Sequence, residues 1–199
     1  MSSKAKAGPI LELRSVTPDA WVDAVMADFD AFLVDHAACE RKASATGMAF
    51  VVRYPDRAEL LDPLIAFARE ELEHFHRVYG LLAARGLGLG PDVPDPYVKP
   101  LVGAVRTGRD ERLLDRLLVA GVVEARGCER FGMVARALPP GELADFYADI
   151  TRSEARHHGL FSRLARAYFD ETTIGARLDE LLDLEARIIA GLPLRAALH

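Results

Sequence analysis

Cysteine is scarce in this sequence, and its scarcity excludes several kinds of site. The 199 residues include two cysteines, Cys39 and Cys128, which lie far apart rather than in a C-x-x-C pair. Two thiols are too few for a disulfide framework, for a four-thiolate zinc site or for a rubredoxin-like electron-transfer centre. We therefore expect both cysteines to be reduced thiols that help to fill the core.

Long apolar runs are also missing. No stretch reaches the roughly eighteen apolar residues that a membrane-spanning helix needs. The opening residues, MSSKAKAGPI, lack the apolar segment that follows the positive charges of a secretory signal. These absences predict a cytoplasmic protein that does not enter a membrane. Half of the residues are hydrophobic, which is enough to bury a sizeable core.

An excess of positive charge is absent as well. The formal net charge is -5, so the chain as a whole does not attract nucleic acid, and binding to a polyanion requires a local basic patch. Two groups of basic residues can contact phosphates, although each residue can equally be ordinary solvated surface charge. They are Arg41, Lys42, Arg53 and Arg57 in the first group, and Lys99, Arg106 and Arg109 in the second.

Alternating strand patterns are absent, and the segments between turn signals are helical in period. The first predicted helix opens at TPDAW, with Thr17 as N-cap and Pro18 at the first helical position. The predicted helices run from there to about Val52, from Asp62-Pro63 to near Arg85-Gly86, from about Asp110 to Leu138, from PPGE to about Phe169, and from about Thr172 to Ala190.

The stretch GLGLGPDVPDPYVKP contains too much glycine and proline for regular structure and predicts a long crossover loop. Four long helices with one long crossover are typical of ferritin-like bundles. We predict an all-α fold, a ferritin-like four-helix bundle with a long crossover between helices 2 and 3 and an additional C-terminal helix. Residues 1–199 are expected to form a single domain, with residues 1–16 as an N-terminal tail.

A Glu-x-x-His motif occurs twice, and each copy is preceded by a lone glutamate at nearly the same distance. The repeated pattern supplies four carboxylates and two imidazoles from four helices. This is the ligand set of ferritin-like di-metal carboxylate proteins. The predicted metal ligands are Glu40, Glu71, His74, Glu124, Glu154 and His157.

Helical phase supports this set, because ligands must face the bundle axis. At about 100° per residue, Glu71 and His74 share an apolar face with Phe67. The overlapping motif Glu73-x-x-His76 has the same spacing but falls on the opposite, charged face. The other four predicted ligands lie on the apolar faces of their helices in the same way.

Carboxylates on apolar faces need compensation, since an unpaired buried charge costs several kcal/mol or more. Two divalent ions balance four carboxylates. Oxygen-rich ligation with one imidazole per metal suits iron or manganese better than zinc. Either the two lone glutamates or the two motif glutamates can bridge the metals.

Several neighbours of this set have two interpretations. His36 lies one turn before Glu40 and is either its partner or a core-edge histidine. His158 lies near the inner face and can orient a carboxylate. Tyr147 is either a radical site or a core tyrosine with a hydrogen-bonded hydroxyl. Cys128, one turn beyond Glu124, either contacts the site or packs as a small residue.

Four stretches together resemble the tRNA 2-methylthio-N6-isopentenyladenosine hydroxylases, the MiaE family, over most of residues 17–169. The stretches are LVDHAACERKASATGMAF, FAREELEHFHRVYGLLAARG, RLLDRLLVAGVVEARGCERFGMVARALP and FYADITRSEARHHGLFSRLAR. The resemblance implies that the same six residues bind two iron ions. It also implies oxygen-dependent hydroxylation of the isopentenyl side chain on a modified adenosine next to the tRNA anticodon.

This interpretation requires O2 and an external electron donor, an unidentified reductase or ferredoxin-type protein, and we expect a monomer or small homo-oligomer. The ligand set alone leaves other functions open, because the fold and ligands do not determine the reaction. One is a ferritin-like iron-handling or peroxide-scavenging protein. Another is a di-iron hydroxylase that acts on a different substrate.

Overall fold

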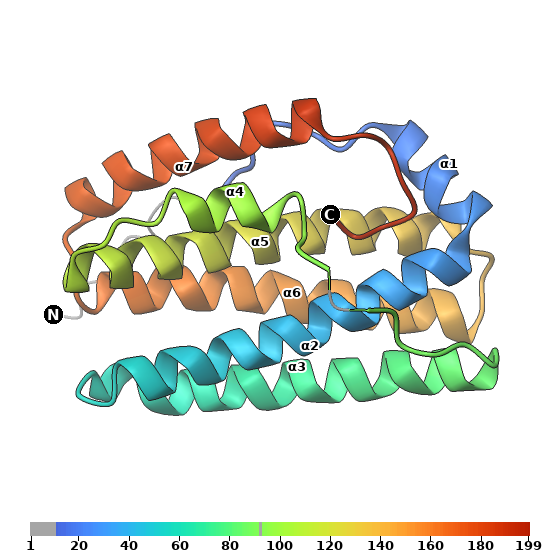
Figure 1. The fold of residues 1–199 in the computed structure, drawn as a ribbon, viewed down its shortest axis with the longest axis horizontal. Helices are drawn as coiled ribbons and strands as arrows, with labels where there is room; N and C mark the ends of the chain where they lie inside the picture. Colours follow the sequence, from blue (N-terminus) through green and yellow to red (C-terminus); the bar gives the residue numbers. More distant parts are fainter. Residues whose placement is uncertain (1–10, 92) are drawn as a thin grey trace, which may run out of the picture.

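The computed structural model describes residues 11–91 and 93–199, and all regular secondary structure within them is helical (Figure 1). This confirms the predicted all-α class. The helices are α1 (Asp19–Ala27), α2 (Phe29–Arg53), α3 (Ala58–Ala84), α4 (Val98–Gly103), α5 (Arg109–Ala137), α6 (Glu142–Arg166) and α7 (Glu171–Gly191).

Two pairs of long helices form the bundle. Helix α2 packs against α3, and α5 packs against α6. Helix α7 lies over α5 on one side of the bundle, and the crossover from α3 to α5 runs along the bundle beside them (Figure 1). The predicted ferritin-like bundle with a crossover and a C-terminal helix is confirmed. The crossover differs from the prediction in one respect, because its second half forms the short helix α4.

The predicted first helix is two helices. The chain breaks at Asp28, whose backbone is non-helical and whose side chain caps α2 by accepting a hydrogen bond from the Ala31 N–H at 3.1 Å. The prediction of Thr17 as N-cap is also wrong, since Pro18 holds that position without a side-chain cap. The Thr17 hydroxyl instead donates to the Glu129 carboxylate at 2.6 Å. Tertiary partners therefore outcompete the local cap.

Helix α3 begins earlier than predicted. It starts at Ala58, so Pro63 lies inside the helix rather than at its first position. The proline ring removes one backbone hydrogen bond near the start of the helix. Leu60 and Leu64, on either side of it, are completely buried, and their burial offsets that loss.

The six predicted ligands lie midway along their helices, between two apolar clusters. One cluster includes Phe50, Phe67 and Phe161, and the other includes Phe32 and Phe131. A close approach of α2 to α3 occurs at Gly47, where a Cβ atom would lie 2.8 Å from a ring carbon of Phe67. Apolar packing therefore closes both ends of the polar centre.

Helix α7 is tied to the bundle by a buried ion pair. Arg126 of α5 donates from Nε to Glu185 of α7 at 2.8 Å, and both side chains are completely buried. The hydroxyl of Tyr97 donates to the same carboxylate oxygen at 3.2 Å. Through these contacts Glu185 joins α7 to α5 and to the segment that leads into α4.

Replacing Arg126 by methionine is expected to lower the free energy of unfolding by about 3–5 kcal/mol, because Glu185 would remain buried without its cation. Urea unfolding followed by circular dichroism measures the change. The double variant Arg126→Met/Glu185→Leu should recover most of the loss. Arg152→Met, which breaks only an exposed pair, is the control and should cost less than about 1 kcal/mol. Equal losses in the two single variants would contradict this account of α7.

Of the predicted tail, residues 1–10 lie outside the described residues. Leu11 is buried with Val122 and Leu182, and Arg14 pairs with Asp179 of α7 at 2.7 Å. The single-domain assignment remains a prediction. Within residues 11–91 and 93–199, no helix has the length and apolar content that spanning a membrane requires.

Candidate metal centre

The six predicted ligands converge at the centre of the bundle, although they come from four helices. Glu40 lies on α2, the first Glu-x-x-His motif on α3, Glu124 on α5 and the second motif on α6. All six side chains are buried. Near the middle of a long helix the apolar face points at the bundle axis, so the phase that buries the leucines and phenylalanines also brings these polar groups together.

The six residues form two groups of potential ligand atoms, each spanning at most 4.8 Å. Glu71 and Glu154, the motif glutamates, belong to both groups. The sequence left open which pair of carboxylates bridges two metals, and the shared membership favours the motif glutamates. The two groups are Glu40, Glu71, His74 and Glu154, and Glu71, Glu124, Glu154 and His157.

Both imidazoles direct Nδ1 at the carboxylates. The Nδ1 atom of His74 lies 3.5 Å from Glu71 and 3.6 Å from Glu40. The Nδ1 atom of His157 lies 2.6 Å from Glu71 Oε1 and 3.6 Å from Glu124. Each carboxylate group therefore has one imidazole nitrogen facing it.

Short distances here do not amount to hydrogen bonds. Glu71 Oε1 and the Nδ1 atoms of His74 and His157 are buried and lack a hydrogen-bond partner among the described residues. The Nδ1 atom of His157 approaches Glu71 Oε1 to 2.6 Å, yet neither atom donates a hydrogen bond to the other. Lone pairs that converge without hydrogen bonds are what ligands of a common cation require. The residues present therefore fit a pair of metal ions.

The electrostatics of the carboxylates agree with this fit. Burial, together with the charge of Glu40, raises the pKa of Glu71 to about 8. Burial and the charges of Glu124 and Glu71 raise the pKa of Glu154 well above its ordinary value. Carboxylates this close repel one another when ionised, and two divalent cations remove that repulsion.

His36 is a hydrogen-bond partner of Glu40 rather than a core-edge histidine that stands apart from the centre. Its Nε2 lies 2.6 Å from Glu40 Oε1, and its Nδ1 lies 3.1 Å from the hydroxyl of Tyr147. Burial would raise the pKa of Glu40, but the hydrogen bond with His36 and the nearby imidazole of His74 lower it below its ordinary value. Tyr147 is thus a core tyrosine with a hydrogen-bonded hydroxyl. The chain Tyr147–His36–Glu40 fixes the orientation of this carboxylate.

Glu70 is a neighbour of the centre that the sequence pattern did not reveal. Its Oε2 lies 3.1 Å from His157 Nε2, on the side of the imidazole opposite Nδ1. Burial would raise the pKa of Glu70, but hydrogen bonds from Ser153 and His157 lower it to about 2. A carboxylate in this position orients the imidazole and holds its proton on Nε2. Its only sequence signal is its place beside Glu71, at the edge of the inner face of α3.

The remaining candidates stay apart from the two ligand groups. Glu73 and His76 are exposed, as the helical phase predicted. Cys128 is half-buried and contacts the carbonyl oxygen of Thr151, with Sγ 3.5 Å away. His158 is half-buried, burial lowers its pKa, and its Nδ1 has no hydrogen-bond partner among the described residues.

A cavity of about 650 Å³ reaches the centre from one side. Its inner wall contains Glu124, Val119, Val123 and Phe161. The crossover and α4 form another part of the wall, so the segment predicted to be a plain loop encloses this space. Five residues also line the small space among the carboxylates, namely Cys39, Ala43, Val123, Glu124 and His199.

Comparison with known protein families shows the family to which the chain belongs. Residues 8–199 match the family described as tRNA-(MS[2]IO[6]A)-hydroxylase (MiaE). The chain belongs to the MiaE family. The resemblance predicted from four helical stretches is thereby confirmed, and it extends over nearly the whole sequence rather than over residues 17–169 alone.

Two curated relatives of this MiaE-family chain carry the name tRNA 2-(methylsulfanyl)-N(6)-isopentenyladenosine(37) hydroxylase. The relative from Pseudomonas putida is 37% identical over 188 residues, which cover 89% of this chain and 91% of the relative. The relative from Salmonella typhimurium is 28% identical, with 91% of this chain and 85% of the relative covered.

A solved structure from Synechococcus has the same fold, with a TM-score of 0.89 and 37% identity, and the match covers 94% of each chain. It is described as Protein 43 with aldehyde deformylating oxygenase activity. An enzyme of the MiaE family and a protein with a different oxygenase activity thus share this fold.

Proposed function

We propose that this chain is an oxygen-dependent di-iron monooxygenase that hydroxylates the isopentenyl side chain of 2-methylthio-N6-isopentenyladenosine in tRNA. Family membership over residues 8–199 supports the reaction class. The observation that carries the proposal for this chain is the cavity, because buried apolar residues beside Glu124 and more exposed arginines, which we call its mouth, line the same space. An apolar side chain attached to a polyanion is the kind of ligand that suits both parts.

In this proposal Glu40, Glu71, His74, Glu124, Glu154 and His157 hold two iron ions, with Glu71 and Glu154 shared between them. When bound, such an iron pair supplies the activation of O2 that attack on an unactivated C–H bond requires. The chain itself supplies ligands whose orientation His36 and Glu70 fix through hydrogen bonds. The apolar clusters on both sides exclude water from the centre.

The inner cavity wall positions the side chain that is oxidised. Val119, Val123 and Phe161 offer an apolar surface, and Val123 also lines the space among the carboxylates. Burying a branched five-carbon group against them gains roughly 0.8 kcal/mol for each methylene-sized group removed from water. Apolar packing alone therefore positions the reacting carbon next to Glu124, because the isopentenyl group has no polar atom that could be hydrogen-bonded.

The mouth carries positive charge that the protein does not neutralise. Arg53, Arg112 and Arg116 line the cavity, and none of them has a carboxylate partner among the described residues. Burial and the charges of Arg53 and Arg112 lower the pKa of Arg116, so the three guanidinium groups repel one another. In a chain of net charge -5, such a cluster favours an anion, and a phosphodiester backbone provides one.

Three other basic residues singled out in the sequence differ from this cluster because they pair with carboxylates. Arg57 pairs with Asp110, and Arg109 pairs with Asp56 at 2.6 Å, so both are neutralised at the surface. Arg106 lines the cavity but is bound to the buried Asp115 at 2.7 Å. Lys42 and Lys99 also line the cavity.

The double variant Arg53→Ala/Arg112→Ala is expected to weaken tRNA binding and to reduce the slope of log affinity against log salt by about 2, one for each lost phosphate contact. Filter binding or fluorescence anisotropy at several salt concentrations measures this. The control is Arg69→Ala, an exposed arginine on the outer face of α3 that does not line the cavity. An unchanged salt slope in the double variant would place tRNA on another surface.

Electrons must come from a separate protein in this proposal. The sequence contains two cysteines, which are too few for an iron–sulfur or rubredoxin-like centre. We therefore propose an external reductase or ferredoxin-type donor, and a monomer or small homo-oligomer that leaves the mouth of the cavity open. A shell of many subunits, as in iron storage, would instead favour the iron-handling alternative.

A second candidate is oxygen-dependent attack on an apolar aldehyde, which the likeness to the Synechococcus structure favours. The apolar inner wall would accept an aliphatic chain equally well. The three arginines, which have no carboxylate partner in the described part of the chain, distinguish the two candidates, because an aldehyde has no charge for them to bind. Incubation of the reduced, iron-loaded protein with a long-chain aldehyde tests this second candidate directly.

The proposed function is tested by digesting tRNA from cells with and without the protein and weighing the nucleosides. We expect the hydroxylated form of the modified adenosine only when both the protein and oxygen are present, with its unhydroxylated precursor accumulating otherwise. Nucleosides that are identical in the two strains would remove the substrate assignment even if the metal centre were intact.

A further inference from the structure

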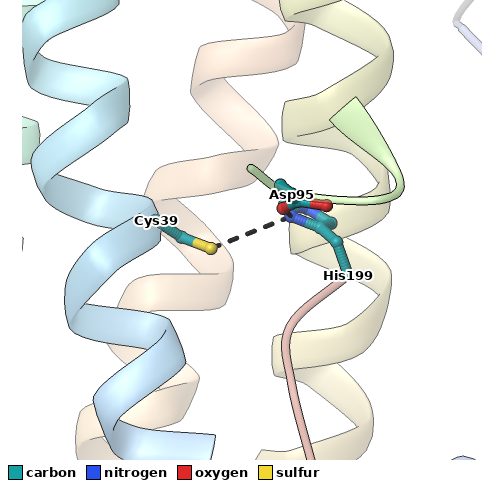
Figure 2. Close-up of side chains that lie close together, drawn as sticks. All are labelled: Cys39, Asp95 and His199. Carbon is teal, nitrogen blue, oxygen red and sulfur yellow. Dashed lines mark hydrogen bonds and ion pairs between the residues drawn. The ribbon is translucent and has the colours of Figure 1, made fainter. Parts of the chain in front are cut away.

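A second group of potential ligands lies outside the six-residue centre. Cys39, Asp95 and His199 approach one another from three separate parts of the chain (Figure 2). Cys39 lies on α2, Asp95 on the crossover before α4, and His199 on the segment that follows α7. One potential ligand atom from each residue lies within 4.8 Å of the others.

Two of the distances between these atoms are close to the edges of a tetrahedron around a small divalent ion. The Cys39 Sγ atom lies 3.8 Å from His199 Nδ1, which in turn lies 3.2 Å from Asp95 Oδ2. Metal–ligand bonds of about 2.3 Å to sulfur and about 2.0–2.1 Å to nitrogen or oxygen give tetrahedral edges of about 3.5 Å and 3.3 Å. The sulfur and the Asp95 oxygen lie within 4.8 Å of each other, so an ion between them would draw these two ligands together.

Two of the three side chains are held in place by other contacts. The Oδ1 atom of Asp95 accepts hydrogen bonds from the backbone N–H groups of Tyr97 at 2.8 Å and Val98 at 3.3 Å, which leaves Oδ2 for the group. The imidazole of His199 stacks on the ring of Tyr97, with centroids 4.7 Å apart and planes at 15°. Metal ligands are typically oriented in this way by groups behind them.

The thiol lies in surroundings that suit a cation. Its Sγ is 3.8 Å from Asp35 Oδ2, so carboxylates lie on two sides of it. A thiol–imidazole catalytic pair does not fit this geometry, because the same His199 nitrogen faces both the thiol and Asp95, while Nε2 is buried without a partner among the described residues.

We propose that Cys39, Asp95 and His199 form a separate site for one zinc-class divalent ion in the wall of the large cavity. A sulfur, a nitrogen and a single carboxylate oxygen suit zinc, whereas the four carboxylates of the central site suit iron or manganese. Three protein ligands leave a fourth position for water or for a donor atom of a molecule in the cavity. All three residues line that cavity.

The test uses the full chain with its central site already loaded with iron. One equivalent of Zn²⁺ is added, unbound metal is removed, and zinc and iron are counted per chain by elemental analysis. We expect one retained zinc in the unaltered protein and in Cys128→Ser, the matched control at the other cysteine. We expect a loss of zinc affinity of at least about 100-fold in Cys39→Ser and Asp95→Asn.

Cobalt provides a readout that identifies the thiolate. Co²⁺ in place of zinc should give a sulfur-to-cobalt charge-transfer absorption that disappears in Cys39→Ser and persists in Cys128→Ser. Iron content and helical circular dichroism identify any variant that fails to fold. If Cys39→Ser fails to fold, the cobalt spectrum of the unaltered protein alone tests whether a thiolate binds the metal. Absence of that absorption, or equal zinc retention in the two cysteine variants, would overturn the proposal. Hydroxylation is not a readout here, and the iron count shows separately whether the central site is loaded, so failure of the zinc site and failure of the proposed function are distinguishable.

Discussion

Glu124→Ala is expected to abolish stoichiometric iron binding and, with it, hydroxylation. Glu124 is one of four buried carboxylates that balance the proposed cation pair, and it belongs to the group that includes His157. Its loss leaves three negative charges and opens one coordination position. We expect an affinity loss larger than the 10–100-fold that removing an outer hydrogen-bond partner of a ligand usually causes.

Iron per chain is measured by elemental analysis after anaerobic loading and desalting, where the unaltered protein should retain two. The control is Glu73→Ala, because Glu73 lies two residues from Glu71 on the same helix but is exposed. It should retain two irons and full activity. If Glu73→Ala lost iron and Glu124→Ala kept it, the helical phases that define the site would be wrong.

Filling the cavity is expected to stop hydroxylation without disturbing the metals. Ala120 lines the apolar part of the cavity one turn before Glu124 and is absent from the small space among the carboxylates. Ala120→Phe places a ring where the isopentenyl group is proposed to lie. We expect kcat/KM for tRNA to fall by about 100-fold or more, the effect that a displacement of about 1 Å at the reacting atom can have.

The matched control is Ala66→Phe, which makes the same change at an exposed position on α3. It should leave kcat/KM and tRNA affinity unchanged. Both variants should retain two irons, and Ala120→Phe should bind tRNA more weakly only by the share that burial of the side chain contributes. Full activity in Ala120→Phe would mean that the side chain reaches the metals by a different route.

The bundle and the six-residue centre could be predicted because both depend on local periodicity. Residues on one face of a helix share their environment, so the spacing that brought Glu71 and His74 together also excluded Glu73 and His76. The doubling of the motif then supplied information that no single glutamate contains. Which carboxylates the two groups share could not be predicted, since it depends on how four helices are rotated against one another.

Contacts between distant parts of the chain account for what the sequence did not predict. Thr17 has the chemistry of an N-cap, but Glu129 of α5 binds its hydroxyl. Glu70 looks like an ordinary surface glutamate in the sequence, but it contacts Ser153 and His157 of another helix. Asp95 and His199 meet across the crossover and the end of the chain, at 3.2 Å. Proximity of this kind follows from tertiary packing rather than from spacing along a helix.

The central claim is that iron held by these six groups uses O2 to hydroxylate the side chain in the cavity. The most direct measurement is a single turnover with the reduced, iron-loaded protein, tRNA that carries the unhydroxylated nucleoside, and isotopically heavy O2, followed by nucleoside mass spectrometry. The account predicts one heavy oxygen atom in the isopentenyl group and none in the Glu124→Ala variant. Oxygen derived from water, or labelling that persists without Glu124, would contradict it.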